Sequence, residues 1–230
     1  DHRDKHVPRG ARRYHHLVAL AANETGYRNL IKLVSLGFLE GLYGGKPRVS
    51  MDLLARHSEG ILASTACIAG LVPQALLGEE DPDAAVKAGR AALDRLLVVF
   101  GDRLYLELQD HGIPEQRRIN PLLVRLSKES GVPLIFTNDS HFVGDEDFEP
   151  HRWFLAIQAG RGQTVATKEY VYTPGHKFRS GAEMRALAKA YPKELRPALL
   201  EAVERTVEVA DRVDFSFQTG TYFLPQVETG

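Results

Sequence analysis

Short apolar runs and longer amphipathic stretches alternate along this chain. Four apolar runs predict strands, at residues 16–22, 61–64, 104–109 and 134–136. The amphipathic stretches between and around them predict helices, at about residues 23–43, 51–57, 70–77, 83–100 and 114–130. This order of strand and helix favours an α/β fold in which parallel strands are covered by helices.

The pattern changes at the two ends of the chain. Residues 1–13 are basic and polar without periodicity, and they predict a loop. After residue 141 we expect a helix to about residue 158, a short strand at 170–172, helices at 181–191 and 194–213, and an extended tail. The last 50 or so residues therefore predict a helical extension in place of further strand–helix units.

Polar or soft side chains follow three of the predicted strands, where ligands gather in α/β proteins. They are Cys67, the pair Asp110 and His111, and the stretch TNDSH with Asp139 and His141. In an extended chain Asp139 and His141 point the same way, and a carboxylate beside an imidazole is half of a divalent metal site. An Asx turn that caps the next helix, with His141 in solvent, explains this local pattern equally well.

The other cysteine and histidine positions carry weaker signals. Cys67 is either a small buried hydrophobe or a thiol that needs a partner histidine. His111 is either a metal-site residue or a core or helix-capping histidine. We expect His151 and His176 at the surface.

Composition narrows the class of protein. The 230 residues carry one cysteine and a net charge of −1, which excludes a disulfide framework, suits a cytoplasmic protein and gives no overall basic field for nucleic acid. No apolar run approaches the length of a membrane span. P-loop, G-x-G-x-x-G and C-x-x-C motifs are absent, and the chain lacks an initiator Met, which predicts a fragment.

Four stretches taken together resemble one known family. NLIKLVSLGFLEG, the S-x-x-C-x-A-G turn, YLELQDHG and TNDSH resemble the PHP (polymerase and histidinol phosphatase) domain of the bacterial DNA polymerase III alpha subunit. The resemblance runs from about Tyr14 over nearly the whole chain and is weaker beyond residue 177. It implies an incomplete, distorted (β/α)7 barrel at residues 1–178. Residues 179–230 would be a helical extension and linker toward the polymerase palm.

The resemblance also implies a metal cluster. Its ligands here would be His16, Cys67, Asp139 and His141, with Asp110 and His111 as supporting neighbours. The implied metal is zinc or manganese, and mixed nitrogen, oxygen and sulfur donors suit zinc best. The family's His-x-His, Thr-Asp-His and glutamate motifs are missing from these residues, which implies an N-terminally truncated fragment with about half the ligands and weak or no metal binding.

The functions implied belong to a longer parent protein. The parent would be a cytoplasmic DNA-directed DNA polymerase that uses DNA, deoxynucleoside triphosphates and magnesium, together with a sliding clamp and a proofreading subunit. None of its polymerase carboxylates lie in this segment, so the segment alone would be inactive. The PHP part would be a 3′–5′ exonuclease or a scaffold. The alternatives are a free-standing metal-dependent phosphoesterase and a non-catalytic interaction module.

Overall fold

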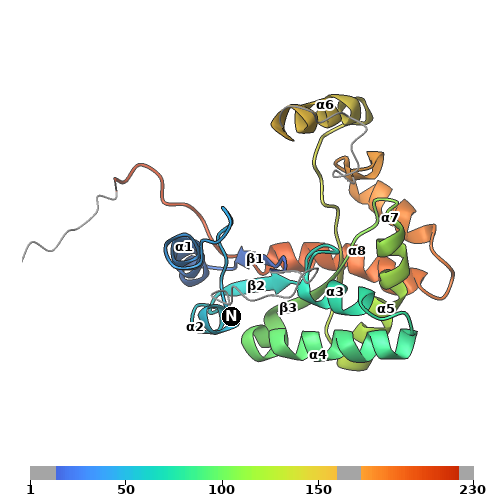
Figure 1. Cartoon of the computed structure of the whole chain (residues 1–230), viewed down its shortest axis with the longest axis horizontal. Helices are drawn as coiled ribbons and strands as arrows, with labels where there is room; N and C mark the ends of the chain where they lie inside the picture. Colours follow the sequence, from blue (N-terminus) through green and yellow to red (C-terminus); the bar gives the residue numbers. More distant parts are fainter. Residues whose placement is uncertain (1–13, 160–171, 223–230) are drawn as a thin grey trace, which may run out of the picture.

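A four-stranded sheet forms the centre of the computed structural model, which describes residues 14–159 and 172–222 (Figure 1). In spatial order the strands are β1 (Val18–Ala21), β2 (Ile61–Ser64), β3 (Leu104–Leu108) and β4 (Leu134–Phe136). All four predicted strands are confirmed, and β2 and β4 have the predicted bounds. The loop predicted at residues 1–13 and most of the strand predicted at 170–172 lie outside the described residues.

The first strand corrects one expectation. β2, β3 and β4 are parallel, but β1 pairs with β2 in the antiparallel sense, so the prediction of parallel strands is wrong for β1. β1 lies at an edge of the sheet, and its Val18 and Leu20 are 38% and 43% exposed. An antiparallel strand tolerates water on one face, whereas parallel strands need cover on both.

Eight α-helices surround this sheet within the described residues. They are α1 (Glu24–Leu39), α2 (Met51–Arg56), α3 (Leu71–Leu77), α4 (Pro82–Phe100), α5 (Pro114–Ser130), α6 (Phe148–Ala159), α7 (Gly181–Lys189) and α8 (Arg196–Asp211). Local signals set their ends: the Asn23 side chain accepts from Gly26 N at 3.0 Å, and Gly131 ends α5 in the left-handed conformation. Pro114 occupies the first turn of α5, where its missing N–H costs nothing.

The strands present two different faces. One face carries Ala63, Leu106 and Leu134, which belong to the main apolar core with side chains of α3, α4 and α5. The other face carries Leu62, Tyr105 and Ile135 in a smaller cluster and becomes polar toward the carboxyl ends of the strands. The mixed α/β class predicted from the sequence is therefore confirmed.

The last two helices complete the packing at the β4 side of the sheet. Met184 of α7 and Leu199 and Val203 of α8 are buried in the main core. Arg205 of α8 donates a hydrogen bond to the Leu134 carbonyl oxygen of β4 at 3.0 Å, so the helix satisfies part of the sheet edge. By contrast, α6 stands away from the sheet (Figure 1), and no described helix is long and apolar enough to cross a membrane.

A buried tyrosine fixes the segment that follows β3. The Tyr191 hydroxyl donates to Asp110 Oδ2 at 2.8 Å and accepts from Asn120 Nδ2 at 2.8 Å. The same amide donates to the Gln109 carbonyl oxygen at 3.0 Å. Burial and the neighbouring Asp110 carboxylate raise the pKa of Tyr191 well above its usual value. The hydroxyl therefore stays protonated and holds the end of β3 against α5 and the α7–α8 connection.

We expect Tyr191→Phe to lower the free energy of unfolding by about 1–3 kcal/mol, because two buried polar groups lose their partner. Urea denaturation followed by circular dichroism measures the change. Tyr222→Phe is the matched control; Tyr222 is 94% exposed, and a change below about 0.5 kcal/mol is expected there. Equal stability of the two variants would contradict the assigned role.

Candidate metal centre

A buried carboxylate connects the carboxyl ends of three strands. Glu107 of β3 is 5% exposed and accepts hydrogen bonds from the hydroxyls of Ser64, at the end of β2, and Thr137, just after β4. Gln109 Nε2 donates to the same carboxylate at 2.9 Å. The three strands are thus joined through one side chain as well as through their backbones. Sequence reasoning missed Glu107, although a charged residue within the apolar run LYLEL was a signal.

A cavity of about 1240 Å³ opens beyond this carboxylate. Its lining includes Glu107, Gln109 and three of the four predicted ligands, His16, Cys67 and Asp139. These side chains come from the segment just before β1, from the loop after β2, from β3 and the residue that follows it, and from the segment after β4. His141 is not among the residues that line this cavity.

His16 and Cys67 form the first close pair of predicted ligands. His16 Nδ1 lies 3.5 Å from Cys67 Sγ. Backbone contacts hold the pair in place: His16 N donates to the Ala69 carbonyl at 3.0 Å, and Ala66 has a left-handed φ of 59° in the turn before Cys67. Nitrogen and sulfur ligands of one tetrahedral zinc ion lie about 3.6 Å apart, given the usual metal–ligand distances. The pair therefore has the spacing of two ligands of one ion.

Asp139 and His141 form the second pair. Asp139 Oδ1 lies 3.4 Å from His141 Nε2, so the two side chains meet as the sequence predicted. Oxygen and nitrogen ligands of one tetrahedral ion lie about 3.4 Å apart. The two side chains are 45% and 31% exposed, which leaves room for an ion and further ligands.

The neighbours of Asp139 differ in what they contact. His111 is 3% exposed, and its Nε2 lies 3.2 Å from the backbone N of Asp139. Burial and the nearby His176 lower the pKa of His111 to about 4, so its ring is neutral near pH 7. Asp110 instead accepts from Gly112 N and Tyr191, and it lies 3.6 Å from Arg117. His111 thus touches a predicted ligand, whereas Asp110 stabilises the turn beside it.

Two histidines expected at the surface lie close to this region. His176 is 4% exposed, so its predicted surface position is wrong; its ring stacks on that of His111 at 4.0 Å, and its carbonyl accepts from His141 N at 2.8 Å. His151 is half-buried, with its ring 6.0 Å from that of His141. His176 lies in a 3₁₀ turn (Pro174–His176) that packs against the strand-end segments, a long-range contact with no periodic signal in the sequence.

The electrostatic surroundings of Cys67 argue against a free nucleophilic thiolate. Burial raises the pKa of the Cys67 thiol; the hydrogen bond with the Ala69 backbone opposes this rise, and the carboxylates of Asp139 and Glu107 each add a smaller increase. A thiol in such a site is protonated near pH 7. A bound cation would reverse this effect, because metal ligation deprotonates a coordinating thiol.

The four predicted ligands thus form two pairs. Within residues 14–159 and 172–222, no group of three or more His, Cys, Asp and Glu side chains is close enough to hold a metal ion. The donor types and the spacing within each pair nevertheless fit ligands of a divalent metal ion.

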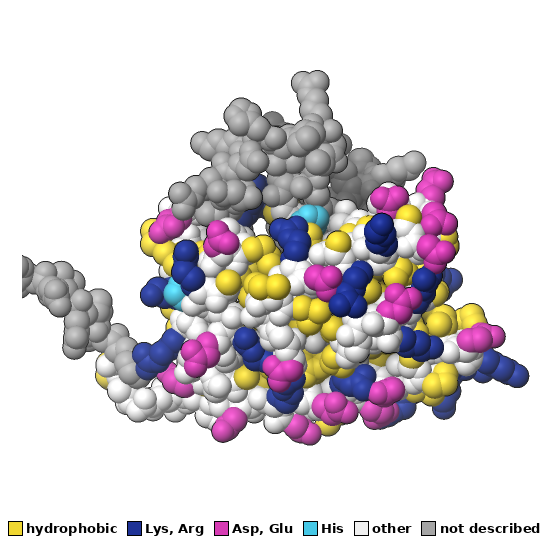
Figure 2. Space-filling view, turned by 90° about the horizontal axis from the view of Figure 1, so that it is seen from below, with side chains coloured by type: hydrophobic (Ala, Val, Ile, Leu, Met, Phe, Trp, Pro, Cys, Tyr) yellow, Lys and Arg dark blue, Asp and Glu magenta, His cyan; other side chains and the backbone are white. Residues whose placement is uncertain are grey.

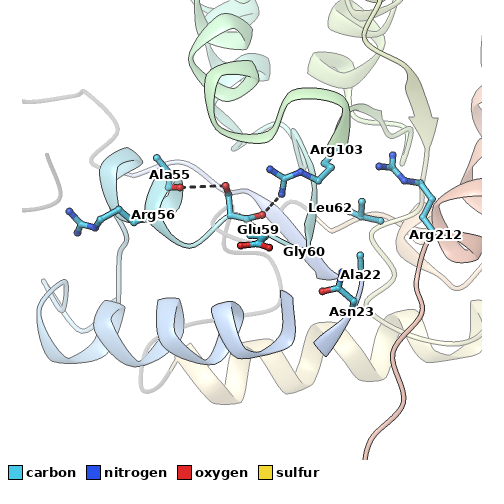
Figure 3. Close-up of a pocket in the computed structure, with 10 residues that line it drawn as sticks. Ala22, Asn23, Ala55, Arg56, Glu59, Gly60, Leu62, Arg103 and Arg212 are labelled. Atoms are coloured by element: carbon cyan, nitrogen blue, oxygen red, sulfur yellow. Dashed lines mark hydrogen bonds between the residues drawn. The ribbon is translucent and has the colours of Figure 1, made fainter. Parts of the chain in front are cut away.

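A second cavity, of about 540 Å³, is lined by three arginines (Figure 3). Arg103 donates to the carbonyl oxygens of Ser58 and Ile61, and Arg212 donates to the Tyr105 hydroxyl at 2.6 Å. Figure 3 shows the third, Arg56, pointing away from the other two. Arg103 and Arg212 therefore use their guanidinium groups on hydrogen bonds within the protein, and they do not form an anion site together with Arg56. Figure 2 shows acidic and basic side chains interspersed on one face of the molecule, without a basic patch there.

Comparison with known proteins finds relatives of this sequence. Residues 2–111 match the PHP domain family. The chain is 38% identical over 200 residues to the DNA polymerase III subunit alpha of Borreliella burgdorferi, and 37% identical over 215 residues to that of Treponema pallidum. It is 34% identical over 222 residues to the subunit of Thermus aquaticus.

These alignments cover 87%, 93% and 93% of this chain but only 16%, 17% and 17% of the three relatives. Residues 2–111, just under half of the chain, therefore resemble the PHP domain family. More particularly, this segment corresponds to the PHP part of DNA polymerase III alpha subunits, as the resemblance implied. The family match ends at residue 111, whereas the similarity to the polymerase subunits extends over most of the chain.

We expect Glu107→Gln to destabilise the protein by about 1–3 kcal/mol even without metal, because the buried carboxylate accepts from side chains of three strand-end segments. Thermal unfolding in the presence of a chelator measures this. Glu80→Gln, at an exposed position, is the control and should change stability little. A Glu107→Gln protein as stable as the control would show that the three strands do not depend on this carboxylate.

Proposed function

We propose that this segment is the metal-binding PHP part of a replicative DNA polymerase. His16, Cys67, Asp139 and His141 would hold divalent ions at the carboxyl ends of the strands. The observation that carries the proposal is the spacing within the two pairs, 3.5 Å and 3.4 Å, each typical of two ligands on one ion. Because each pair supplies only two donors, an ion bound there would need further ligands besides these four residues.

The donor chemistry favours zinc, with manganese as the alternative. A thiolate and an imidazole suit zinc, whereas carboxylate oxygen is accepted by both metals. When bound, the ions would activate water for phosphoester hydrolysis, which would give a 3′–5′ exonuclease acting on DNA. His111 would contribute by fixing the backbone of Asp139 through the 3.2 Å contact between its Nε2 and Asp139 N.

The parent protein would carry the remaining functions. It would be a cytoplasmic DNA-directed DNA polymerase that extends DNA from deoxynucleoside triphosphates with magnesium, in contact with a sliding clamp and a proofreading subunit. The polymerase carboxylates would lie outside this segment. Residues 1–178 would form the PHP part, and residues 179–230 would connect it to the polymerase palm.

A scaffold role is the second candidate, and one observation favours it. The described residues contain no group of three ligands that could hold a metal, yet Glu107, Tyr191 and His111 form well-connected buried contacts. In that case the PHP part would brace the polymerase without binding metal.

A paired substitution in the full-length polymerase separates the two candidates. Asp139→Asn combined with His141→Gln should remove bound metal and 3′–5′ exonuclease activity while leaving DNA synthesis intact, because both side chains are partly exposed and outside the core. Metal content by mass spectrometry and degradation of a labelled primer provide the measurements. Asp211→Asn, an exposed position at the end of α8, is the control.

A scaffold predicts the opposite result. The double variant would then be less stable than the Asp211→Asn control, or equally stable. Its metal content and exonuclease activity would equal those of the control. That outcome would reject the metal site. Metal present in the parent and lost together with exonuclease activity in the double variant would reject the scaffold.

A further inference from the structure

Gln109 lines the cavity that is also lined by three of the predicted metal ligands. It follows β3 directly, lies two residues beyond Glu107 and lines the same cavity as Cys67 and Asp139. The residue is only 7% exposed. Its backbone is fixed by the 3.0 Å hydrogen bond from Asn120 Nδ2 to the Gln109 carbonyl. A buried carboxamide is thus held just after the end of β3, at the wall of the cavity.

The orientation of this carboxamide is set by Glu107. Gln109 Nε2 donates to Glu107 Oε1 at 2.9 Å. Exchanging the amide nitrogen and oxygen would place two oxygen acceptors against each other, so the observed orientation is the one that makes a hydrogen bond. Gln109 Oε1 is therefore directed away from the carboxylate.

This oxygen has no hydrogen-bond partner. Three buried side-chain atoms in the described residues lack one: Arg48 Nε, His151 Nε2 and Gln109 Oε1. Among them, Gln109 Oε1 is the one oxygen acceptor, and its residue lines the cavity that contains His16, Cys67 and Asp139. A buried unsatisfied acceptor is costly, so such groups generally have an occupant that satisfies them.

The surroundings indicate the charge of that occupant. The Glu107 carboxylate contacts the Gln109 amide directly, and Asp139 lines the same cavity. Basic side chains line this cavity as well, namely Lys46, Arg48, Arg56 and Arg95. Beside Glu107, an unsatisfied carbonyl oxygen does not attract an anion, whereas a cation is stabilised by the carboxylate and the oxygen together.

We propose that Gln109 Oε1 is an additional oxygen ligand for the divalent cation of this cavity, with Glu107 holding the carboxamide in the ligating orientation. The inference rests on the metal site proposed above and adds a neutral oxygen to its donors. Carbonyl oxygen suits manganese, whereas the Cys67 sulfur and the His16 nitrogen suit zinc. Gln109 therefore shifts the preference of the site toward manganese.

Metal titration of the full-length polymerase tests this. The metal-free protein is titrated with Mn²⁺, followed by the electron paramagnetic resonance signal of the free ion, and separately with Zn²⁺ in competition with a chromophoric chelator. Gln109→Leu should weaken Mn²⁺ binding about ten-fold, with a smaller effect on Zn²⁺. Gln109→Glu should bind Mn²⁺ at least as tightly as the parent, because a carboxylate oxygen replaces the amide oxygen.

Two further variants complete the design. Gln74→Leu is the control: this half-buried glutamine of α3 donates to the Ile68 carbonyl and does not line the cavity, so both affinities should stay unchanged. Gln109→Asn keeps the amide but withdraws its oxygen by one carbon, and it should also weaken Mn²⁺ binding if Gln109→Leu does not fold.

The outcomes distinguish this inference from the metal site itself. If the parent binds metal and the Leu and Asn variants bind Mn²⁺ as tightly as the parent, Gln109 is not a ligand and the four-residue site stands alone. If the parent binds neither ion, both proposals are rejected. A parallel ten-fold loss of Mn²⁺ and Zn²⁺ would overturn the proposed preference for manganese.

Discussion

The hydrogen bonds to the Glu107 carboxylate are the interaction on which the candidate site depends. They join β2, β3 and the segment after β4 at the level where the apolar sheet becomes polar. A buried carboxylate is costly unless its oxygens are satisfied, so its donors must be in place whenever the protein is folded. The hydrogen bonds that satisfy Glu107 therefore also fix the ends of the three strands, and with them the positions of Cys67, Gln109 and Asp139.

This arrangement explains why the predicted ligands occur as pairs. His16 reaches Cys67 across the β1–β2 side of the sheet, whereas Asp139 and His141 meet within one extended segment after β4. Each pair depends on local backbone contacts, and neither requires the other. Charge connects them, because the Asp139 carboxylate raises the pKa of Cys67. A bound cation would offset that effect and favour the thiolate form of Cys67 that a metal ligand needs.

Sequence periodicity predicted the four strands and most helices because each element here has a strong local signal. β2 and β4 are uninterrupted apolar runs, and α5 begins with Pro114 and ends at Gly131. The direction of β1 had no such signal, because the residues of a strand do not show whether it pairs parallel or antiparallel with its neighbour. The burial of His176 was missed for a similar reason: a single 3₁₀ turn, far along the chain, supplies the stacking partner of His111.

The candidate site was predictable to the extent that residue type alone identifies a ligand. Asp139 and His141 were open to two explanations from spacing, and the resemblance to a known family favoured ligation; their 3.4 Å contact is compatible with it. Glu107 and Gln109 lie in the stretch YLELQDHG, but the resemblance assigns neither of them a role, and their importance follows from their hydrogen bonds within the fold. The carboxylate uses both of its oxygens on protein donors, whereas the carboxamide beside it uses only its nitrogen. That asymmetry leaves an unsatisfied oxygen on a residue that lines the cavity and contacts the Glu107 carboxylate, and a cation is an occupant that both groups would stabilise.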